Sequence, residues 1–416
     1  MAAPASVRLG ASRCLSVRPR LLFLAQRMPF PPNKGEKIRA FHTLMHFRKR
    51  FDIHLGCCID DDADLAHIDA LRGLCADLHV ARIDPRLGRL LSLRGLLTGQ
   101  ALTVAYFGDT GLRAWVRETM ARVKPAAVFA YSSNIAPAML DVPFAGIRIV
   151  DLVDVDSAKF HAYARDARLP MDFVYHREGR KIAALERRIA QECDAAIFVS
   201  EAEATLFRTL QPGHDRSVRA IGNGVDHGYF DPAIGYDAPY DSGEINFVFT
   251  GTMDYRPNID AVGWFAGAIF PLIRRTLPDA QFHIVGANPT PEVQRLAHRP
   301  HVHVTGRVAD VRPYLAYATA AVAPMRIARG IQNKVLEAMA MARPTVTTTQ
   351  GLEGIAAADG VEVLLADSAE AFAARCIGLA TDPDAARIGA AARRHVLAHC
   401  DWDARLAAYD AILDGL

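Results

Sequence analysis

The sequence PMRIARGIQNKVLEAMAMARPTVTTT, residues 324–349, places a short loop between an apolar run and a helix. Val335, Leu336 and Met339 give its middle an apolar stripe at helical spacing, among strong helix formers. The preceding run TAAVAP has the length and composition of a buried strand. Gly330 lies between the two, so the expected order is strand, loop and helix. The N-terminus of such a helix presents free backbone N–H groups above the end of the strand.

Charged residues around this helix N-terminus favour a phosphate-containing ligand. Arg326, Arg329 and Lys334 lie near it in the sequence. Arginine offers a planar fork to phosphate oxygens, and lysine offers a point charge. Glu337 follows Lys334 by three positions and projects from nearly the same helix face, where a carboxylate can accept hydrogen bonds from ribose hydroxyls. A nucleoside diphosphate site is one interpretation, and a solvated Lys–Glu pair on a helix surface is the other.

The composition predicts a globular protein of two domains. The chain has 416 residues, of which 51% are hydrophobic and 23% charged. Its seven cysteines are an odd number without C-x-x-C spacing, which indicates neither a disulfide framework nor a zinc site and fits a reducing cytosol. The histidine pairs at 42 and 46 and at 301 and 303 have no acidic or cysteine partner, so we expect no metal. No apolar run reaches the about 20 residues of a membrane-spanning helix.

Charge is distributed unevenly along the chain. Residues 1–225 hold 32 Lys and Arg against 24 Asp and Glu, whereas residues 226–416 hold 16 against 22. A basic first half suggests an anionic partner. Within it, residues 85–106 read PRLGRLLSLRGLLTGQALTVAY and interleave leucines with Arg86, Arg89 and Arg94. Two interpretations are open: the segment rests on an anionic membrane surface, or it is a helix packed on the domain with its arginines in water.

The first half alternates buried strands with helices. RLLFLAQ (residues 20–26) precedes a loop rich in Pro and Gly, a helix from near Glu36 and the apolar run FDIHLGCCI, which predicts a βαβ unit. Gly35 at the junction lets the backbone approach a ligand closely. The fingerprint G-x-G-x-x-G is missing, which argues against a nicotinamide dinucleotide site. Further along, RIVDLVDVDS (residues 148–157) ends in an acidic cluster, from which we select Asp154 over Asp156 as the functional candidate.

Two further signals organise the middle of the chain. Ser200, followed three residues later by Glu203, predicts a capping box at a helix start. The turn-rich segment IGNGVDHGYFDP, residues 221–232, marks a domain boundary. After it the βα pattern restarts, with a loop around Gly251 in which Arg256 predicts a second anion contact. Two domains of this kind meeting at their strand ends would form a deep cleft.

Four motifs together resemble a GT-B glycosyltransferase of the retaining family 4, also called glycosyltransferase group 1. They are GNGVD (residues 222–226), FTGTMDYRPN (249–258), HVTGRVADVRPYL (303–315) and ARGIQNKVLEAMAMARPTVTT (328–348). More narrowly, PFPPNKGEKIRAFH with DLVDVDS resembles the sugar transferases associated with PEP-CTERM/exosortase exopolysaccharide systems. The resemblance implies an α/β protein with the GT-B fold, two doubly wound Rossmann-like domains with a cleft between them.

The composition of the N-terminal segment, the turn-rich linker and the resemblance together predict a division of the chain. We expect a disordered lead-in at residues 1–19 and an N-terminal, acceptor-side Rossmann-like domain at 20–225. A C-terminal, nucleotide-sugar-binding Rossmann-like domain would cover 226–395, and a C-terminal helix at 396–416 would pack back on the first domain.

By the same resemblance, the protein would be a retaining, metal-independent hexosyltransferase in the cytoplasm. It would move a sugar from a nucleotide diphosphate sugar, a co-substrate rather than a cofactor, to a growing polysaccharide or lipid-linked glycan. Nucleic acid is not an expected partner, and contact with the inner face of the cytoplasmic membrane stays open. The implied catalytic residues are Asp154, Lys334 and Arg329, and the implied donor-binding residues are Gly35, Gly251, Arg256, Arg326, Gly330, Asn333 and Glu337.

Three departures from the family pattern keep alternatives open. Arg329 stands where a sugar-binding glutamate is usual, Thr252 and Asn258 replace a usual basic pair, and Asp154 replaces a usual histidine. A UDP-sugar epimerase of the same fold is one alternative. A non-catalytic nucleotide-sugar-binding subunit of a polysaccharide assembly complex is another.

Overall fold

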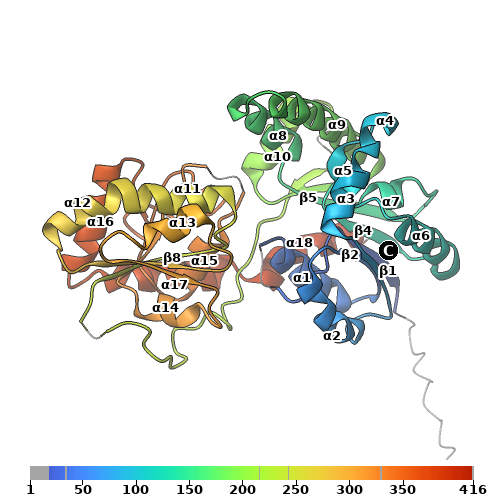
Figure 1. Ribbon diagram of the computed structural model, residues 1–416. Helices are drawn as coiled ribbons and strands as arrows, with labels where there is room; N and C mark the ends of the chain where they lie inside the picture. Colours follow the sequence, from blue (N-terminus) through green and yellow to red (C-terminus); the bar gives the residue numbers. More distant parts are fainter. Residues whose placement is uncertain (1–17, 33–34, 215, 242, 328–329, 415–416) are drawn as a thin grey trace, which may run out of the picture.

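Two parallel β-sheets, each covered by helices on both faces, form the two lobes of the molecule (Figure 1). This computed structural model describes residues 18–32, 35–214, 216–241, 243–327 and 330–414. We call the part built on the first sheet the first domain and the part built on the second sheet the second domain.

The first sheet has seven strands in the order β3-β2-β1-β4-β5-β6-β7, and every neighbouring pair is parallel. Its strands are continuous apolar runs because both faces of the sheet are covered, and Leu21, Leu22, Phe23, Leu24 and Ala25 are fully buried. The strands are β1 (Arg20–Ala25), β2 (Asp52–Ile59), β3 (Asp77–Arg82), β4 (Ala127–Tyr131), β5 (Ile147–Val153), β6 (Ala195–Phe198) and β7 (Val218–Ala220).

The second sheet has six strands in the order β10-β9-β8-β11-β12-β13, again all parallel. Its strands are β8 (Asn246–Thr250), β9 (Gln281–Val285), β10 (Val302–Gly306), β11 (Ala320–Ala323), β12 (Thr345–Thr347) and β13 (Leu364–Leu365). In both sheets the strand order reverses once, beside β1 and β4 in the first and beside β8 and β11 in the second. Ligands of open α/β sheets bind at such reversals, outside the carboxyl ends of the strands.

Helices connect the strands as the sequence pattern predicts. Those of the first domain are α1 (Gly35–Arg48), the 3-10 turn η1 (Asp62–His67), α2 (Ile68–Arg72), α3 (Pro85–Ser92), α4 (Arg94–Thr98), α5 (Leu102–Tyr106), α6 (Thr110–Val123), α7 (Pro137–Leu140), α8 (Asp156–Asp166), α9 (Met171–Glu192) and α10 (Glu201–Leu210). The later ones are α11 (Arg256–Trp264), the π-helical turn η2 (Phe265–Ile269), α12 (Phe270–Thr276), α13 (Pro291–Leu296), α14 (Arg312–Tyr317), α15 (Asn333–Ala340), α16 (Ala369–Thr381), α17 (Ala386–His399) and α18 (Trp402–Leu413).

The last helix, α18, leaves the second domain and lies beside α1 of the first (Figure 1). Trp402, Leu406, Tyr409 and Leu413 are buried in the same apolar cluster as the residues of β1 and α1. Exposed ion pairs flank this contact, including that of Arg50 with Asp410 on α18, at 2.9 Å. The C-terminal helix therefore ties the two domains together through a hydrophobic contact.

The segment 85–106 folds in a way that the interpretation of a packed helix did not anticipate. It forms three short helices, α3, α4 and α5, and the buried positions of the first two are the small residues Gly88, Ser92 and Gly95. The side chains of Ile83 and Tyr106 occupy the space that a Cβ at Gly88 would need. The small residues thus allow close packing on the domain, and the leucines between them are left facing solvent.

Two other expectations can be compared with the structure. Ser200 caps α10 by accepting from the backbone N–H of Glu203 at 3.2 Å, as predicted. The Glu203 carboxylate, however, accepts from the backbone N–H of Val155 at 2.7 Å and holds the loop after β5, so only the Ser200 half of the predicted capping box forms. The six cysteines of the described ranges carry free thiols. No helix within these ranges is long and apolar enough to cross a membrane.

Candidate functional site

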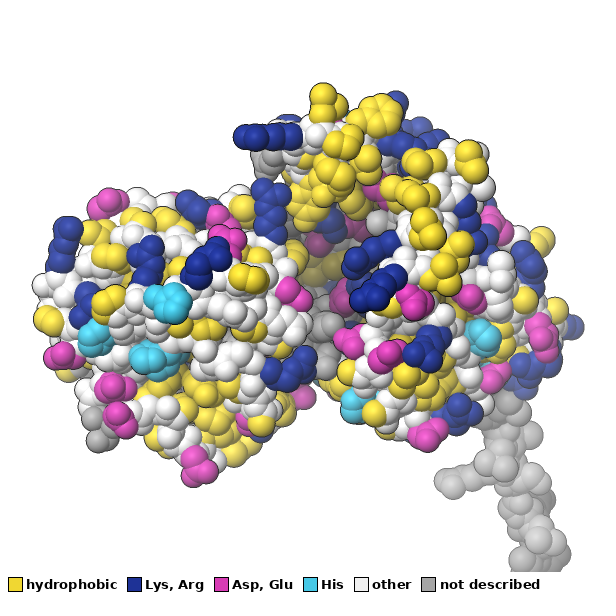
Figure 2. All heavy atoms as spheres, viewed as in Figure 1, with side chains coloured by type: hydrophobic (Ala, Val, Ile, Leu, Met, Phe, Trp, Pro, Cys, Tyr) yellow, Lys and Arg dark blue, Asp and Glu magenta, His cyan; other side chains and the backbone are white. Residues whose placement is uncertain are grey.

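The N-termini of α1 and α15 meet between the two domains. Gly35 is the first residue of α1 and Asn333 is the first of α15. A Cβ built on Gly35 would lie 3.5 Å from Nδ2 of Asn333. The space-filling view shows the molecule hollowed between the two domains (Figure 2). Two helix N-termini therefore direct their positive dipole ends toward the same region.

A chain of buried side chains fixes this meeting point. Arg39 of α1 donates to Asp151 at 2.7 Å and to Asn223 at 2.9 Å, and Asn223 in turn donates to Oδ1 of Asn333 at 2.9 Å. The hydroxyl of Tyr409 also donates to Asp151, at 2.7 Å. Burial opposes the charge of Arg39, but the Asp151 carboxylate outweighs this effect and raises the Arg39 pKa. The first domain thus holds the first residue of α15 through a permanently charged arginine.

Lys334 lies just inside α15, against the loop that follows β8. Its Nζ donates to Oε1 of Gln332 at 3.1 Å and lies 5.3 Å from the centre of the Phe249 ring. A Cβ built on Gly251 would lie 3.5 Å from Cε of Lys334 and 2.7 Å from Nδ2 of Asn258. Gly251 also has a φ of 156°, so a larger residue is excluded there by both space and backbone conformation.

Desolvation shifts the titration of the Lys334 and Glu337 side chains toward their neutral forms. Burial lowers the pKa of Lys334 to about 8, although the negative charge of Glu337 acts to raise it. Burial raises the pKa of Glu337 to about 7, although the positive charge of Lys334 acts to lower it. Both side chains are half-buried rather than fully enclosed. A bound anion would supply Lys334 with the negative charge that it lacks here, which suits a site for a diphosphate.

Asp154 of the first domain reaches the loop that precedes α15. It follows β5, and a Cβ built on Gly330 would lie 2.5 Å from its Oδ1. Gly330 has a φ of 65°, so the close approach and the left-handed backbone both require glycine. Oδ1 of Asp154 is buried without a hydrogen-bond partner among the described residues. Burial, followed by the charge of Glu203, raises the Asp154 pKa to about 7.

The neighbouring acid, Asp156, is engaged within its own helix. Its carboxylate pairs with Lys159 one turn along α8, and this partner raises the Lys159 pKa although burial opposes it. Of the two acids considered from the sequence, Asp156 therefore has a cationic partner, whereas Asp154 keeps an unpaired oxygen directed at the second domain. Tyr255 precedes α11 in the second domain. Burial raises its pKa, and the charges of Asp154 and Asp156 nearby raise it further.

The structure places two of the predicted arginines at helix α11. Arg326 pairs with Asp260 on α11, with N–O distances of 2.6 and 3.1 Å, and its guanidinium lies 5.1 Å from the Trp264 ring. Arg256 is the exposed first residue of α11. Arg329 lies outside the described residues. The structure thus brings Gly35, Gly251, Gly330, Asn333, Lys334 and Asp154 together through direct contacts of the loops and helix starts that carry them.

Sequence reasoning missed three residues that build this site. Arg39, Asn223 and Glu203 are almost fully buried, and each holds a loop or helix start that faces the cleft. An arginine within a helix and an asparagine between two glycines look like ordinary surface and turn residues. The motif GNGVD contained the only available signal for Asn223, because an asparagine in a turn is often there for its side-chain hydrogen bonds.

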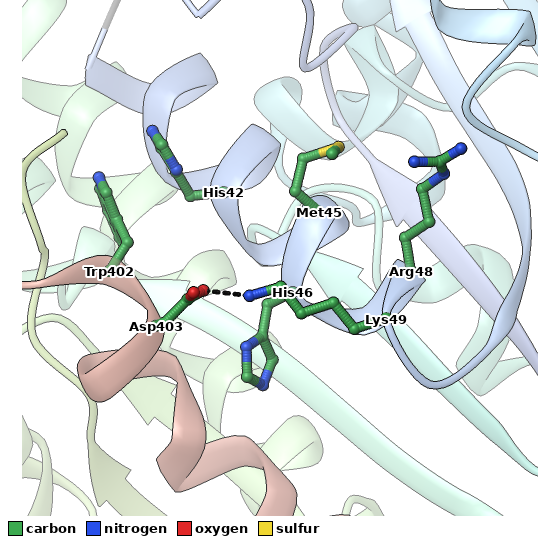
Figure 3. Close-up of a pocket in the computed structure, with 7 residues that line it drawn as sticks. All are labelled: His42, Met45, His46, Arg48, Lys49, Trp402 and Asp403. Carbon is green, nitrogen blue, oxygen red and sulfur yellow. Dashed lines mark hydrogen bonds and ion pairs between the residues drawn. The ribbon is translucent and has the colours of Figure 1, made fainter. Parts of the chain in front are cut away.

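The pocket in Figure 3 lies elsewhere, where α18 packs on α1. It measures about 220 Å³, and the Trp402 ring stacks on His42 at its edge with ring centres 4.6 Å apart. Lys49 and Asp403 close one side with a 2.5 Å ion pair, drawn as a dashed line. None of the predicted site residues lines this pocket, so we assign it to the α1 and α18 contact. Among the described residues no cluster of three metal-ligating side chains occurs.

Comparisons with known proteins concern the second domain and the fold. Residues 244–382, which span most of the second domain, match the family described as Glycosyl transferases group 1. No curated protein sequence matches the chain significantly. Solved structures share the fold over nearly the whole length, which identifies it as GT-B, the fold expected from the sequence.

Three of these structures illustrate the likeness. HepE of Anabaena in complex with UDP and glucose is 16% identical with a TM-score of 0.67, covering 96% of this chain and 100% of that chain. Sucrose-phosphate synthase from Thermosynechococcus elongatus is 16% identical with a TM-score of 0.69, covering 95% and 98%. WaaG, a glycosyltransferase involved in lipopolysaccharide biosynthesis, is 15% identical with a TM-score of 0.64, covering 94% and 99%.

Proposed function

We propose that this protein is a glycosyltransferase that takes a sugar from a nucleoside diphosphate sugar. The observation that carries the proposal is the position of Lys334. It stands at the N-terminus of α15, at the strand reversal of the second sheet, beside the glycine loop after β8. The match of residues 244–382 to Glycosyl transferases group 1 covers this site, and the UDP and glucose bound by the HepE structure are ligands of the proposed kind.

The proposed chemistry follows from the charges that meet in the cleft. The bond between the anomeric carbon and the diphosphate breaks, and its electron pair leaves on a diphosphate oxygen. Lys334 and the N-termini of α15 and α1 stabilise that developing charge, which is the largest contribution that this site can make. Glu337 binds the ribose hydroxyls, and Arg256, Arg326 and Arg329 add positive charge around the phosphates. With these cations, the departing diphosphate needs no divalent metal.

On the first-domain side, we propose that Asp154 contacts the transferred sugar. Its unpartnered Oδ1 accepts a hydrogen bond from a sugar hydroxyl. The acceptor, a growing polysaccharide or a lipid-linked glycan, attacks from the face of the leaving group, and its proton passes to a diphosphate oxygen, so the configuration is retained. An exopolysaccharide system in the cytoplasm is the setting favoured by the sequence resemblance and by the free thiols.

Product analysis tests this function against its two alternatives. The purified chain is incubated in EDTA with UDP, GDP and ADP hexoses and a mixture of glycan acceptors, and the products are followed by mass spectrometry and NMR. We expect a glycoside with the anomeric configuration of the donor, and no product from Lys334→Ala. A UDP-sugar epimerised at one ring carbon, with no glycoside formed, would instead identify an epimerase. A donor that binds without any turnover would identify a non-catalytic subunit.

A further inference from the structure

The first domain exposes an unusually large set of apolar side chains on one face. Figure 2 shows them running from the α8–α9 end of the domain to α3. Leu97 is 93% exposed, Leu169 is 81% and Phe173 is 64%. We call this set the apolar face; its members are Leu87, Leu90, Leu91, Leu93, Leu96 and Leu97 of the α3–α4 segment with Leu169, Met171 and Phe173 at the start of α9. Exposed apolar surface of this extent usually marks a binding surface.

The outward direction of the leucines is built into the fold. Gly88, Ser92 and Gly95 are the residues that pack inward, and a Cβ built on Gly88 would lie 2.8 Å from the Ile83 side chain. Rotating α3 to bury its leucines would therefore push bulky side chains into a space that admits only glycine. The leucines contribute nothing to the core of the domain, so their exposure requires another explanation.

The two parts of the apolar face are held rigidly together. Arg177 of α9 donates to the carbonyl oxygens of Gly95 at 2.7 Å and Gln100 at 2.9 Å. Glu178, which is 3% exposed, accepts from the first backbone N–H groups of α5 at 2.8 Å. The first half of α9 is thus bonded to α4, to the turn after α4 and to the start of α5. The leucines and the α9 residues form one surface rather than two independent loops.

Basic side chains border the apolar face. Arg86, Arg89 and Arg94 are exposed among the leucines, and Arg165 and Arg168 are exposed beside Leu169. The sequence of residues 85–98 contains no Asp or Glu. On an anionic bilayer, the leucines of such a surface insert at the boundary between headgroups and acyl chains, and the surrounding arginines contact the headgroups. A protein partner would more often be met by aromatic anchors with both signs of charge at the rim.

Helix α8 connects this surface to the candidate site. It begins at Asp156, two residues after Asp154, and its 11 residues end just before Leu169. At 1.5 Å per residue the helix spans about 16 Å.

We propose that the first domain docks on an anionic lipid bilayer through the apolar face, which places the cleft about one helix length from the headgroups. The proposal rests on the proposed function in one respect, because it makes a lipid-linked acceptor the substrate that reaches Asp154.

Sedimentation with lipid vesicles tests the proposal. The full chain is mixed with vesicles of phosphatidylcholine alone or with phosphatidylglycerol, at about 0.05 M and about 0.5 M salt, where screening is weak and strong. The variants are Leu90→Ser/Leu97→Ser and Arg86→Gln/Arg89→Gln. Matched controls are Leu210→Ser/Leu397→Ser, at leucines exposed elsewhere, and Arg387→Gln/Arg394→Gln on the second domain.

We expect the wild type to bind the anionic vesicles at low salt and to bind neutral vesicles much less. The arginine variant should lose about fivefold in affinity for each charge, and the leucine variant should lose at least about tenfold at both salt concentrations. The control variants should bind as the wild type does. The proposal would be overturned if the wild type sedimented equally with and without vesicles, or if the leucine variant bound vesicles as the wild type does. It would also be overturned if the wild type formed a dimer without binding vesicles and the leucine variant were monomeric, because the apolar face would then be a protein interface.

A separate measurement distinguishes failure of this proposal from failure of the proposed function. Donor binding by the leucine variant is followed through the melting temperature in the absence of lipid. We expect the same stabilisation as in the wild type, because both leucines are exposed and neither is among the residues that build the candidate site. Loss of both donor binding and vesicle binding would show that the variant is misfolded, and the arginine variant would then decide whether the bilayer contact exists.

Discussion

At the scale of single residues, the site contains ionisable groups whose pKa values lie near neutral pH, so that their protonation responds to a bound ligand. Lys334, Glu337 and Asp154 all have a pKa that burial moves toward neutrality, and all three lie where the domains meet. Arg39 and Asp151, in contrast, form a buried ion pair inside the first domain, and each neutralises the charge of the other. A group without such a partner can instead be stabilised by a ligand of opposite charge.

The pKa of Lys334 predicts how donor affinity varies with pH. Burial lowers this pKa to about 8, and a bound diphosphate raises it again. Above pH 8 the free protein must therefore take up a proton to bind, so affinity falls by up to about tenfold per pH unit. Titration calorimetry of a nucleoside diphosphate between pH 7 and pH 9.5 measures this slope. In Lys334→Arg, which stays charged throughout, the slope should disappear; a wild type with flat affinity over this range would refute the assignment.

Asp154→Asn should separate stability from activity. The folded-state pKa of Asp154 is raised to about 7, so the unfolded chain loses this proton first, and stability falls as pH rises from about 4 to 7. The variant should lack this decline and be more stable than the wild type at pH 8, but about equal to it at pH 4. Its transfer rate should drop about 100-fold. Urea unfolding at both pH values and a kcat measurement check the pair of effects; a variant that keeps full activity would remove Asp154 from the site.

At the scale of elements, the sequence predicted strands and helices better than it predicted their faces. Apolar runs such as RLLFLAQ located β1, and the loop before α15 was expected from Gly330 and the helix pattern. The orientation of α3 was not predictable, because leucines and small residues share its surface and periodicity alone does not say which face is packed. The deciding fact is the space beside Gly88, which Ile83 and Tyr106 fill from other parts of the chain.

Helix α18 should be essential for the stability of the first domain. Leu406 is fully buried against the first domain, so Leu406→Ala should lower the free energy of unfolding by about 2–5 kcal/mol. Leu397→Ala on α17, whose side chain is 46% exposed, is the matched control and should change it by no more than about 0.5 kcal/mol. Urea denaturation gives both values. A small effect at Leu406 would mean that α18 does not dock on the first domain in solution.

At the scale of the whole molecule, the two domains are joined by contacts between residues far apart in the sequence. Arg39 and Asn223 are 184 positions apart, and Asn223 and Asn333 are 110 apart. No periodicity or local motif encodes such pairs, which is why the sequence located the loops of the site but not the side chains that hold them together. The GT-B arrangement itself followed from the βα repeats and the motifs, since each repeat builds its own part of a sheet.

Asn223 should support donor binding, because it links Arg39 of the first domain to Asn333 at the start of α15. Asn223→Ala leaves Nη1 of Arg39 and Oδ1 of Asn333 without this partner, which costs about 1–3 kcal/mol. We expect a several-fold higher KM for the donor with a smaller change in kcat, because the variant disturbs α15 without touching the reacting atoms. Asn288→Gly, which removes an exposed hydrogen bond to Asp254 at a positive φ that glycine tolerates, is the control. Equal KM values for both variants would contradict this coupling.

The central claim is that a nucleoside diphosphate binds at the N-terminus of α15 through Lys334. Titration calorimetry with UDP, GDP and ADP in the presence of EDTA tests it on the wild type, Lys334→Ala and the surface control Lys49→Ala. We predict that one nucleotide binds the wild type and the control equally and binds Lys334→Ala about 10 to 100 times more weakly, as loss of a charge-assisted hydrogen bond requires. Equal affinity in all three proteins, or binding that appears only when a divalent metal replaces EDTA, would contradict the account.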